Sequence, residues 1–218
     1  MGRPSDRLPL FYCRAFAINK HTYSGPFSFE NPAGCGQSWR MNSNADLAAL
    51  IRNIPDYPKP GIMFRDVSSL LLDADGYRMT IDRLAALVDP DTQLVAGIEA
   101  RGFIVASALA YVLGLGQLML RKPGKLPGEK IGTDYTLEYG TDRIEMHVGH
   151  VQPDQKVLLV DDLIATGGTA LAGVDLIQQG GGRVEQALFI VDLPDLGGAA
   201  KLRAQGVRVA SLIGFDGD

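Results

Sequence analysis

The densest group of residues able to do chemistry is the run VLLVDDLIATGGT, residues 157–169. Four apolar residues lead directly into two acids, Asp161 and Asp162, and then into a loop of hydroxyls and glycines. Such an apolar run is typical of a strand that is buried on both faces. Because successive side chains of a strand point to opposite faces, we expect the two acids at its end to have different roles.

The loop that follows, Ala165 to Thr169, is typical of an anion site. It opens a predicted helix over residues 169–179, with Thr166 or Thr169 near the N-cap, and the first N–H groups of a helix have no partner within it. The two glycines let the backbone approach an anion, and the hydroxyls add donors. A lone TGGT would also suit an ordinary strand-to-helix turn. The preceding acids favour a phosphorylated sugar, because they would accept hydrogen bonds from its hydroxyls.

A second strand end has a similar character. In LVAGIEARGF, residues 94–103, the predicted strand ends in Glu99, and Arg101 lies in the turn before a helix. An arginine whose stem packs on the sheet is the alternative interpretation. Because open α/β sheets bind ligands beyond the carboxyl ends of their strands, we expect this stretch and the DD loop to meet.

Four positive charges, Arg121, Lys122, Lys125 and Lys130, fall within ten residues among glycines and prolines. By composition alone the segment is a solvated loop. Beside an anion site, a mobile cationic loop would neutralise a negatively charged leaving group and exclude water.

The elements that must position these residues alternate along the chain, which predicts a mainly parallel sheet flanked by helices. We expect Pro-rich residues 54–61 and 123–132 to be loops, and 133–138 with 143–148 to form a two-stranded antiparallel flap. Residues 63–72 should be extended at first and then turn. Helices are predicted at 45–53, 75–88 (apolar face Met79, Leu84, Leu87 and Val88), 101–113, 169–179 and 196–205, and strands at 94–99, 116–121, 157–160, 184–191 and 207–213.

The composition bounds the class of protein. The chain has 218 residues and a net charge of −4, which suits one domain and argues against a general nucleic-acid surface. No apolar run is long enough for a transmembrane helix. Residues 1–40 contain both cysteines, Cys13 and Cys35, and show no sustained period, so we expect a poorly structured extension before a cytoplasmic domain at 41–218. Met41 could be the translation start, and a targeting or partner-binding tail is the alternative.

These motifs resemble those of a known family. VLLVDDLIATGGT resembles the phosphoribosyl-pyrophosphate (PRPP) loop of type I phosphoribosyltransferases, and LVAGIEARGF resembles their pyrophosphate loop. MFRDVS at 63–68 and YTLEYG at 135–140 resemble the base-binding segment and hood of the adenine phosphoribosyltransferases in particular. The matches keep the family's order over residues 45–192. The resemblance implies an α/β fold with a mainly parallel twisted sheet, a small hood and an antiparallel flexible-loop flap.

It also implies a reaction, in which adenine and PRPP give AMP and pyrophosphate in purine salvage. Mg²⁺ would be required, held mainly by PRPP and water, and the enzyme would be a homodimer. Glu138 is implied in proton transfer at the purine ring. The resemblance also implies a strained or cis peptide in the Ala100–Arg101 region, as in relatives.

The resemblance assigns the remaining roles by matched position. The 5′-phosphate would be bound by the loop residues Ala165, Thr166, Gly167, Gly168 and Thr169. The ribose hydroxyls would be bound by Asp161 and Asp162. The resemblance implies that pyrophosphate is bound by Arg101 and by Arg121, Lys122 and Lys125, the last three supplied by a neighbouring subunit as in the family's dimers. Phe64 would stack on adenine, the backbone of Met63 and Arg65 would read its edge, and Leu163 would pack on its other face.

Two other functions stay open at this point. One is transfer to another purine base, xanthine or hypoxanthine, since backbone hydrogen bonds decide the base. The other is a PRPP-sensing regulator, which would need a DNA-binding domain that the short extension does not suggest. His147 and His150 could pair on a metal but lack a third ligand, which favours surface histidines, and Asp192 and Asp195 flank a proline as turn formers.

Overall fold

The computed structural model describes residues 44–136 and 140–216, and its centre is one five-stranded parallel sheet. The strand order is β4-β3-β7-β8-β9. This confirms the predicted parallel sheet. The strands are β3 (Leu94–Ile98), β4 (Gly116–Leu120), β7 (Lys156–Ile164), β8 (Arg183–Asp192) and β9 (Arg208–Gly214).

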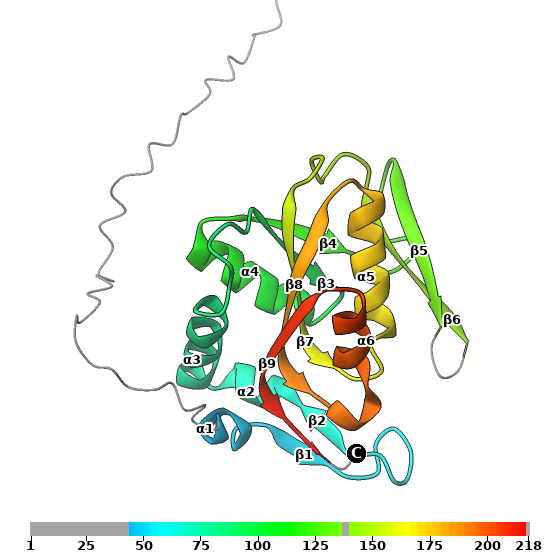
Figure 1. The fold of residues 1–218 in the computed structure, drawn as a ribbon. Helices are drawn as coiled ribbons and strands as arrows, with labels where there is room; N and C mark the ends of the chain where they lie inside the picture. The colour runs from blue at the N-terminus through cyan, green and yellow to red at the C-terminus, as the bar shows by residue number, and fades with distance from the viewer. Residues whose placement is uncertain (1–43, 137–139, 217–218) are drawn as a thin grey trace, which may run out of the picture. The chain divides into compact units, whose positions relative to one another are not determined.

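Helices cover both faces of this sheet (Figure 1). On one face lie α3 (Ala74–Ala85) and α4 (Gly102–Leu113), and on the other lie α5 (Gly168–Gln179) and α6 (Gly198–Ala204). Alternate residues of β7 enter the two cores: Val157 and Leu159 join the α5 side, and Leu158 and Val160 join the α4 side. The strand is therefore buried on both faces, as its continuous apolar run predicts.

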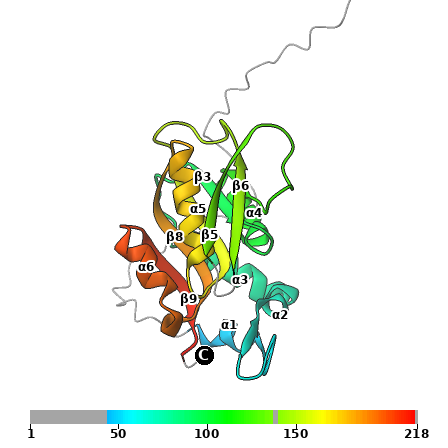
Figure 2. The ribbon, with the colours of Figure 1, turned by 90° about the vertical axis from the view of Figure 1, so that its right-hand side faces the viewer.

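A small subdomain, the hood, lies beyond the carboxyl ends of the sheet strands (Figures 1 and 2). The predicted helix at 45–53 is wrong in its second half, because the helix ends at Ala48 and Arg52–Ile54 is a strand. That strand pairs with the strand after the Pro-rich loop, a partner that local propensity does not see. The hood consists of α1 (Ala45–Ala48), β1 (Arg52–Ile54), β2 (Phe64–Asp66) and α2 (Val67–Leu72).

The predicted flap is an antiparallel hairpin of β5 (Lys130–Thr136) and β6 (Thr141–His147) that packs along α5 (Figure 2). Ile144 and Met146 of β6 are buried in the core on the α5 side. The hairpin begins three residues earlier than predicted, so the loop before it is shorter. Leu126 in that loop is also buried.

The predicted apolar face of the second long helix is partly wrong. α3 ends at Ala85, so Leu87 lies beyond it and is 42% exposed. Leu84 is buried as predicted, and Met79 and Val88 pack against the same core. Gly76, Thr80 and Ile81 complete the buried face, and the Thr80 hydroxyl donates to the Gly76 carbonyl at 2.7 Å. In the described part of the chain, no helix has the length and apolar character needed to cross a membrane.

Candidate active site

The strand that carries the two acids is longer than its apolar run. β7 pairs with β3 only as far as Val160, opposite Gly97, but with β8 as far as Ile164, opposite Asp192. The predicted end at residue 160 is therefore wrong on one side, because β8 continues to supply hydrogen bonds. Asp161 and Asp162 lie in the strand, past its last pair with β3, at the carboxyl edge where α/β sheets bind ligands.

The two acids have different environments. Asp162 is only 3% exposed and forms an ion pair with the Arg101 guanidinium through Nε. Asp161 accepts a hydrogen bond from the Asp162 backbone N–H at 2.9 Å and lies against Gly102 at the start of α4. Burial, reinforced by the charge of Asp162, raises the pKa of Asp161 well above its usual value.

The loop after β7 forms the N-terminus of α5. Gly167 is the N-cap with φ 81°, a left-handed conformation that glycine adopts without strain. Thr166 and Thr169 lie near the N-cap, as predicted, but neither side chain caps the helix. The first-turn N–H groups of α5 have no acceptor within the helix, and no side chain caps them. A cavity of about 130 Å³ opens here, lined by Asp161, Leu163, Ile164, Ala165, Thr166, Gly167, Gly168, Thr169 and Ala170.

The end of the neighbouring strand β3 carries an acid that binds cationic residues. Glu99, after β3, accepts from Arg121 at 3.1 and 3.3 Å and from the Lys122 backbone N–H at 2.8 Å. The hydrogen bond to Arg121 is the main cause that lowers the pKa of Glu99. The Glu99–Ala100 peptide is cis, one residue before the position that the resemblance implied.

Carboxylates of the hairpin bind Lys122 and the backbone of Gly124 in the cationic segment. Lys122 donates through Nζ to the Tyr135 hydroxyl at 2.6 Å and forms an ion pair with Asp142. The Gly124 N–H donates to Glu145, a buried acid of β6, at 3.2 Å, whereas Lys125 is exposed. Asp142 and Glu145 were not predicted from the sequence, because their partners lie about twenty residues earlier in the chain.

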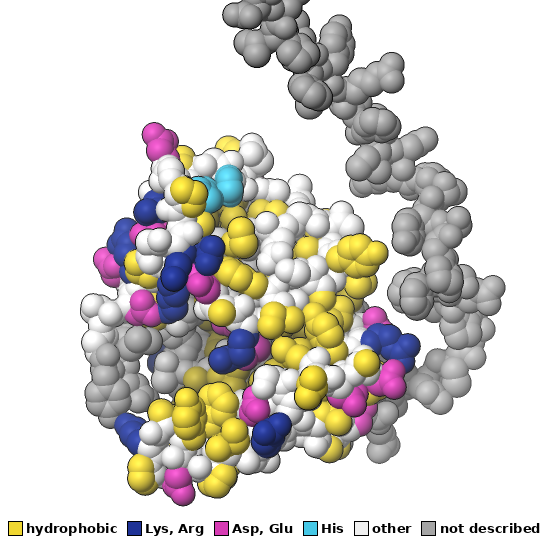
Figure 3. Space-filling model, turned by 180° about the vertical axis from the view of Figure 1, so that it is seen from behind, with side chains coloured by type: hydrophobic (Ala, Val, Ile, Leu, Met, Phe, Trp, Pro, Cys, Tyr) yellow, Lys and Arg dark blue, Asp and Glu magenta, His cyan; other side chains and the backbone are white. Residues whose placement is uncertain are grey.

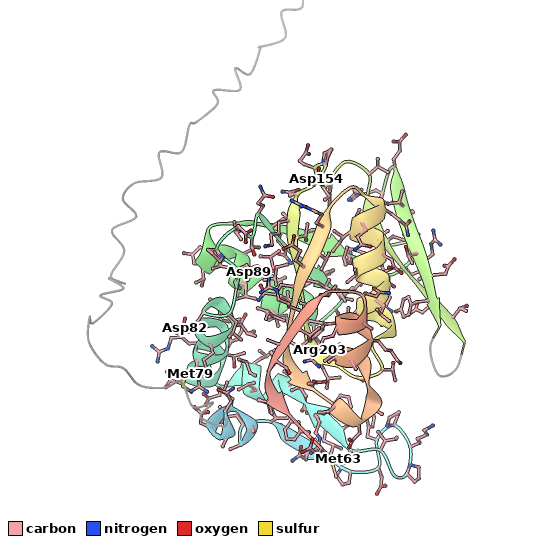
Figure 4. The ribbon with its side chains drawn as sticks, viewed as in Figure 1. Met63, Met79, Asp82, Asp89, Asp154 and Arg203 are labelled. Carbon is pink, nitrogen blue, oxygen red and sulfur yellow. The ribbon has the colours of Figure 1, made fainter. Side chains whose placement is uncertain are left out.

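Of the predicted base-binding residues, Met63, Phe64 and Arg65 lie in the hood, where Figure 4 labels Met63. The Phe64 ring packs edge-to-face on Tyr57, with centroids 5.1 Å apart. The Arg65 side chain donates to Asn53 at 2.9 Å, and its guanidinium lies 4.2 Å from the Phe215 ring centroid. Leu163 instead borders the cavity at the loop Ala165–Thr169, which these hood residues do not line.

A larger cavity, of about 440 Å³, separates the hairpin from the loop Ala165–Thr169. Glu138 lies in the sequence between β5 and β6, outside the described residues. The cavity is lined by Asp134 and Tyr135 of β5, by Thr166, Gly168, Leu171, Ala172 and Asp175 of the loop and α5, and by Lys201 of α6.

The remaining polar candidates do not form a metal site. The rings of His147 and His150 lie 4.6 Å apart, and His147 Nε2 is 2.9 Å from the Pro127 carbonyl oxygen. Within residues 44–136 and 140–216, no group of three His, Cys, Asp or Glu side chains is placed to hold a metal ion. Asp192 was predicted to be a turn former, but it is the buried last residue of β8.

Comparison with known sequences identifies the family. Residues 71–204 match the phosphoribosyl transferase domain. The adenine phosphoribosyltransferase of Sphingopyxis alaskensis is 54% identical over 176 residues, which cover 79% of this chain and 95% of that protein. That of a Bradyrhizobium species is 55% identical over 178 residues, covering 81% and 99%. The chain belongs to the adenine phosphoribosyltransferase family.

Solved structures of the family share the fold. The adenine phosphoribosyltransferase of Thermoanaerobacter pseudethanolicus superposes with a TM-score of 0.75 at 44% identity, covering 78% of this chain and 99% of the other. The Giardia lamblia enzyme in complex with 9-deazaadenine gives 0.75 at 36% identity, covering 79% and 98%. The predicted type I phosphoribosyltransferase fold is therefore confirmed.

Proposed function

We propose that this carboxyl edge transfers the phosphoribosyl group of PRPP to adenine, giving AMP and pyrophosphate in purine salvage. The observation that carries the proposal is the glycine loop at the N-terminus of α5, preceded on the same strand by Asp161 and Asp162. Breaking the bond at the anomeric carbon builds positive charge on the ribose and negative charge on pyrophosphate. A site therefore needs to align the two partners and stabilise both charges.

The 5′-phosphate binds the loop Ala165–Thr169 in this proposal. The unpaired first-turn N–H groups of α5 and the helix dipole both favour an anion there. The hydroxyls of Thr166 and Thr169 add donors. The left-handed Gly167 lets the chain turn into the helix at this point.

Ribose and pyrophosphate bind on the other side of the acids. Asp161 and Asp162 accept from the ribose hydroxyls, and Arg101, in contact with Asp162, reaches the pyrophosphate. Arg121, Lys122 and Lys125 add positive charge around the leaving group. Arg121 and Lys122 would exchange their present carboxylate partners for phosphate oxygens.

Adenine binds between the hood and β7. Phe64 stacks on one face and Leu163 packs on the other, while the backbone of Met63 and Arg65 reads the edge. The Arg65 side chain is already engaged by Asn53 and Phe215, which supports recognition by backbone groups. Glu138, which lies between the hairpin strands in sequence, transfers the proton at the purine ring.

The acids at this edge fit a Mg²⁺ ion that arrives on PRPP. Asp162 and Glu99 are paired with arginines, so Asp161 is the carboxylate that the loop cavity offers, and the other ligands would be PRPP oxygens and water. When bound, the ion neutralises charge on the departing pyrophosphate.

The assembly in this proposal is a homodimer. Three exposed apolar side chains lie on one face of α4 at positions i, i+7 and i+8, namely Ile104, Tyr111 and Val112. Met119 of β4, the next element and an edge strand of the sheet, is also exposed. Figures 1 and 2 place α4 on the side that Figure 3 shows, where hydrophobic side chains gather. Tyr111→Glu is expected to give a monomer by light scattering, and an unchanged mass would reject this face.

We also place the enzyme in the cytoplasm and its activity in residues 41–218, a stretch without cysteine. The function is tested by product formation from PRPP and Mg²⁺ with adenine, hypoxanthine, guanine and xanthine in parallel. AMP from adenine alone is the expected result. Product from an oxopurine would contradict the adenine assignment, and PRPP binding without any product would favour a sensor.

A further inference from the structure

The phosphate loop is supported by the segment of α6. The predicted helix at 196–205 is confirmed as α6 (Gly198–Ala204), which a 3₁₀ turn at Pro194–Leu196 precedes. The Gly198 N–H donates to the Ala165 carbonyl at 3.0 Å, and Lys201 Nζ donates to the Thr166 carbonyl at 2.8 Å. Both acceptors belong to the phosphate loop, more than thirty residues earlier in the chain.

These two bonds fix the direction of the loop's own donors. The N–H and C=O of a trans peptide point in opposite directions, and the loop peptides are trans. Holding the Ala165 oxygen toward α6 therefore turns the Thr166 N–H away from α6. Because Lys201 holds the Thr166 oxygen toward α6, the Gly167 N–H also points away from α6. A carbonyl turned the other way would face the anion and repel it.

The loop and α6 also meet backbone against backbone. A Cβ on Gly198 would overlap the Ala165 carbonyl oxygen and would lie 2.7 Å from the Gly167 nitrogen. A Cβ on Gly167 would lie 2.8 Å from the Gly198 Cα. Because rigid backbone atoms make these contacts, a shift at the start of α6 is passed directly to the loop.

Lys201 is not placed as a ligand of a second anion. The cavity that it borders also contains Asp134 and Asp175, whose charges would oppose one. Its ammonium is hydrogen-bonded to the Thr166 carbonyl and so acts through the loop.

We propose that Gly198 and Lys201 are positioning residues of the phosphate site, which orient the loop peptides for the 5′-phosphate without contacting the substrate. The proposal rests on the proposed function of the loop. It predicts that changes on α6 weaken PRPP binding selectively. They remove binding energy that the bound substrate and the transition state share, so the rate of the chemical step stays the same.

Kinetics of the full chain test this with matched variants. Lys201→Met should raise KM for PRPP about 2- to 10-fold, the equivalent of one hydrogen bond, with kcat and KM for adenine unchanged. Lys201→Arg should restore it. Gly198→Ala should have the larger effect, up to about 10²-fold, because it displaces the backbone. Calorimetric binding of ribose 5-phosphate should weaken in parallel.

Arg203→Met is the control, because it removes one positive charge and one hydrogen bond to a carbonyl, that of Val209 at 3.2 Å, from the same helix (Figure 4). It should leave KM for PRPP unchanged. The inference is overturned if Lys201→Met and Gly198→Ala keep the wild-type KM for PRPP, or if all three variants raise both KM values together. A wild-type chain that makes no AMP would instead reject the proposed function.

Discussion

The two halves of the proposed substrate site are built differently. On the phosphate side, loop Ala165–Thr169 is held by the backbone of α5 and by donors from α6. On the pyrophosphate side, Arg101, Arg121 and Lys122 are long side chains, each paired with a carboxylate of another element. The first half is shaped by covalent geometry and close packing, and the second by charge pairs.

This difference has a consequence for binding. A backbone loop offers its N–H groups in place, so a phosphate finds them already oriented. Paired cations must exchange one anionic partner for another, so their carboxylates compete with pyrophosphate. Variants should therefore separate the two halves by which ligand they weaken.

The largest effect is expected at Glu138, which lies between the hairpin strands in sequence. Glu138→Ala should lower kcat by about 10²–10⁴-fold, the usual contribution of a positioned acid or base. PRPP affinity, measured by calorimetry, should stay at the wild-type value. Glu129→Ala, an exposed acid before β5, is the control. An unchanged kcat would remove Glu138 from the mechanism.

Arg101→Met should come next, with kcat/KM lower by about 10²–10³-fold, because a cation facing the leaving group is lost. It also leaves Asp162, which is nearly buried, without its ion pair, so Tm should fall. Adding Asp162→Asn should recover part of the Tm but none of the activity. Full activity in the single variant would contradict the assignment of Arg101.

Asp161→Asn should lower kcat/KM by about 10–10²-fold, the equivalent of one charged hydrogen bond to ribose, yet raise Tm at neutral pH. The folded pKa of Asp161 is raised above the unfolded value of about 3.9, so the folded chain binds more protons above that pH. Wild-type stability should therefore fall as pH rises from about 3.9 through the raised pKa. Melting curves across pH check this, and parallel curves for both proteins would contradict it.

The smallest effect is expected at Asp142, which holds Lys122 on the hairpin. Asp142→Asn should lower KM for PRPP by at most about fivefold, because a partly exposed ion pair is worth little and its loss frees the cation. Asp134→Asn, which breaks a hairpin pair with Arg143, is the matched control. A raised KM would show that Asp142 presents Lys122 to pyrophosphate instead of competing with it.

Much of the first half could be predicted from sequence because it is local. The strand, the two acids and the glycine loop are consecutive, and their order alone predicts an anion site at a helix N-terminus. The helix start was misplaced by one residue, because Gly167 takes the N-cap and Gly168 begins the helix. The support from Gly198 and Lys201 was not predicted, since it arises only when α6 folds back onto the loop.

The second half was predictable as a set of charges but not as a set of contacts. The cationic segment was evident from composition, whereas Asp142 and Glu145 hold it through hairpin packing that no local pattern encodes. The strand Arg52–Ile54 was missed for the same reason, because its partner lies across the Pro-rich loop.

One titration tests the difference between the halves most directly. Ribose 5-phosphate and pyrophosphate, with Mg²⁺, are titrated by calorimetry into the full chain, Gly198→Ala and Arg121→Met. We expect Gly198→Ala to weaken ribose 5-phosphate alone and Arg121→Met to weaken pyrophosphate alone. If each variant weakened both ligands equally, the two halves would form one coupled site, and the division into a backbone cradle and exchangeable charge pairs would be wrong.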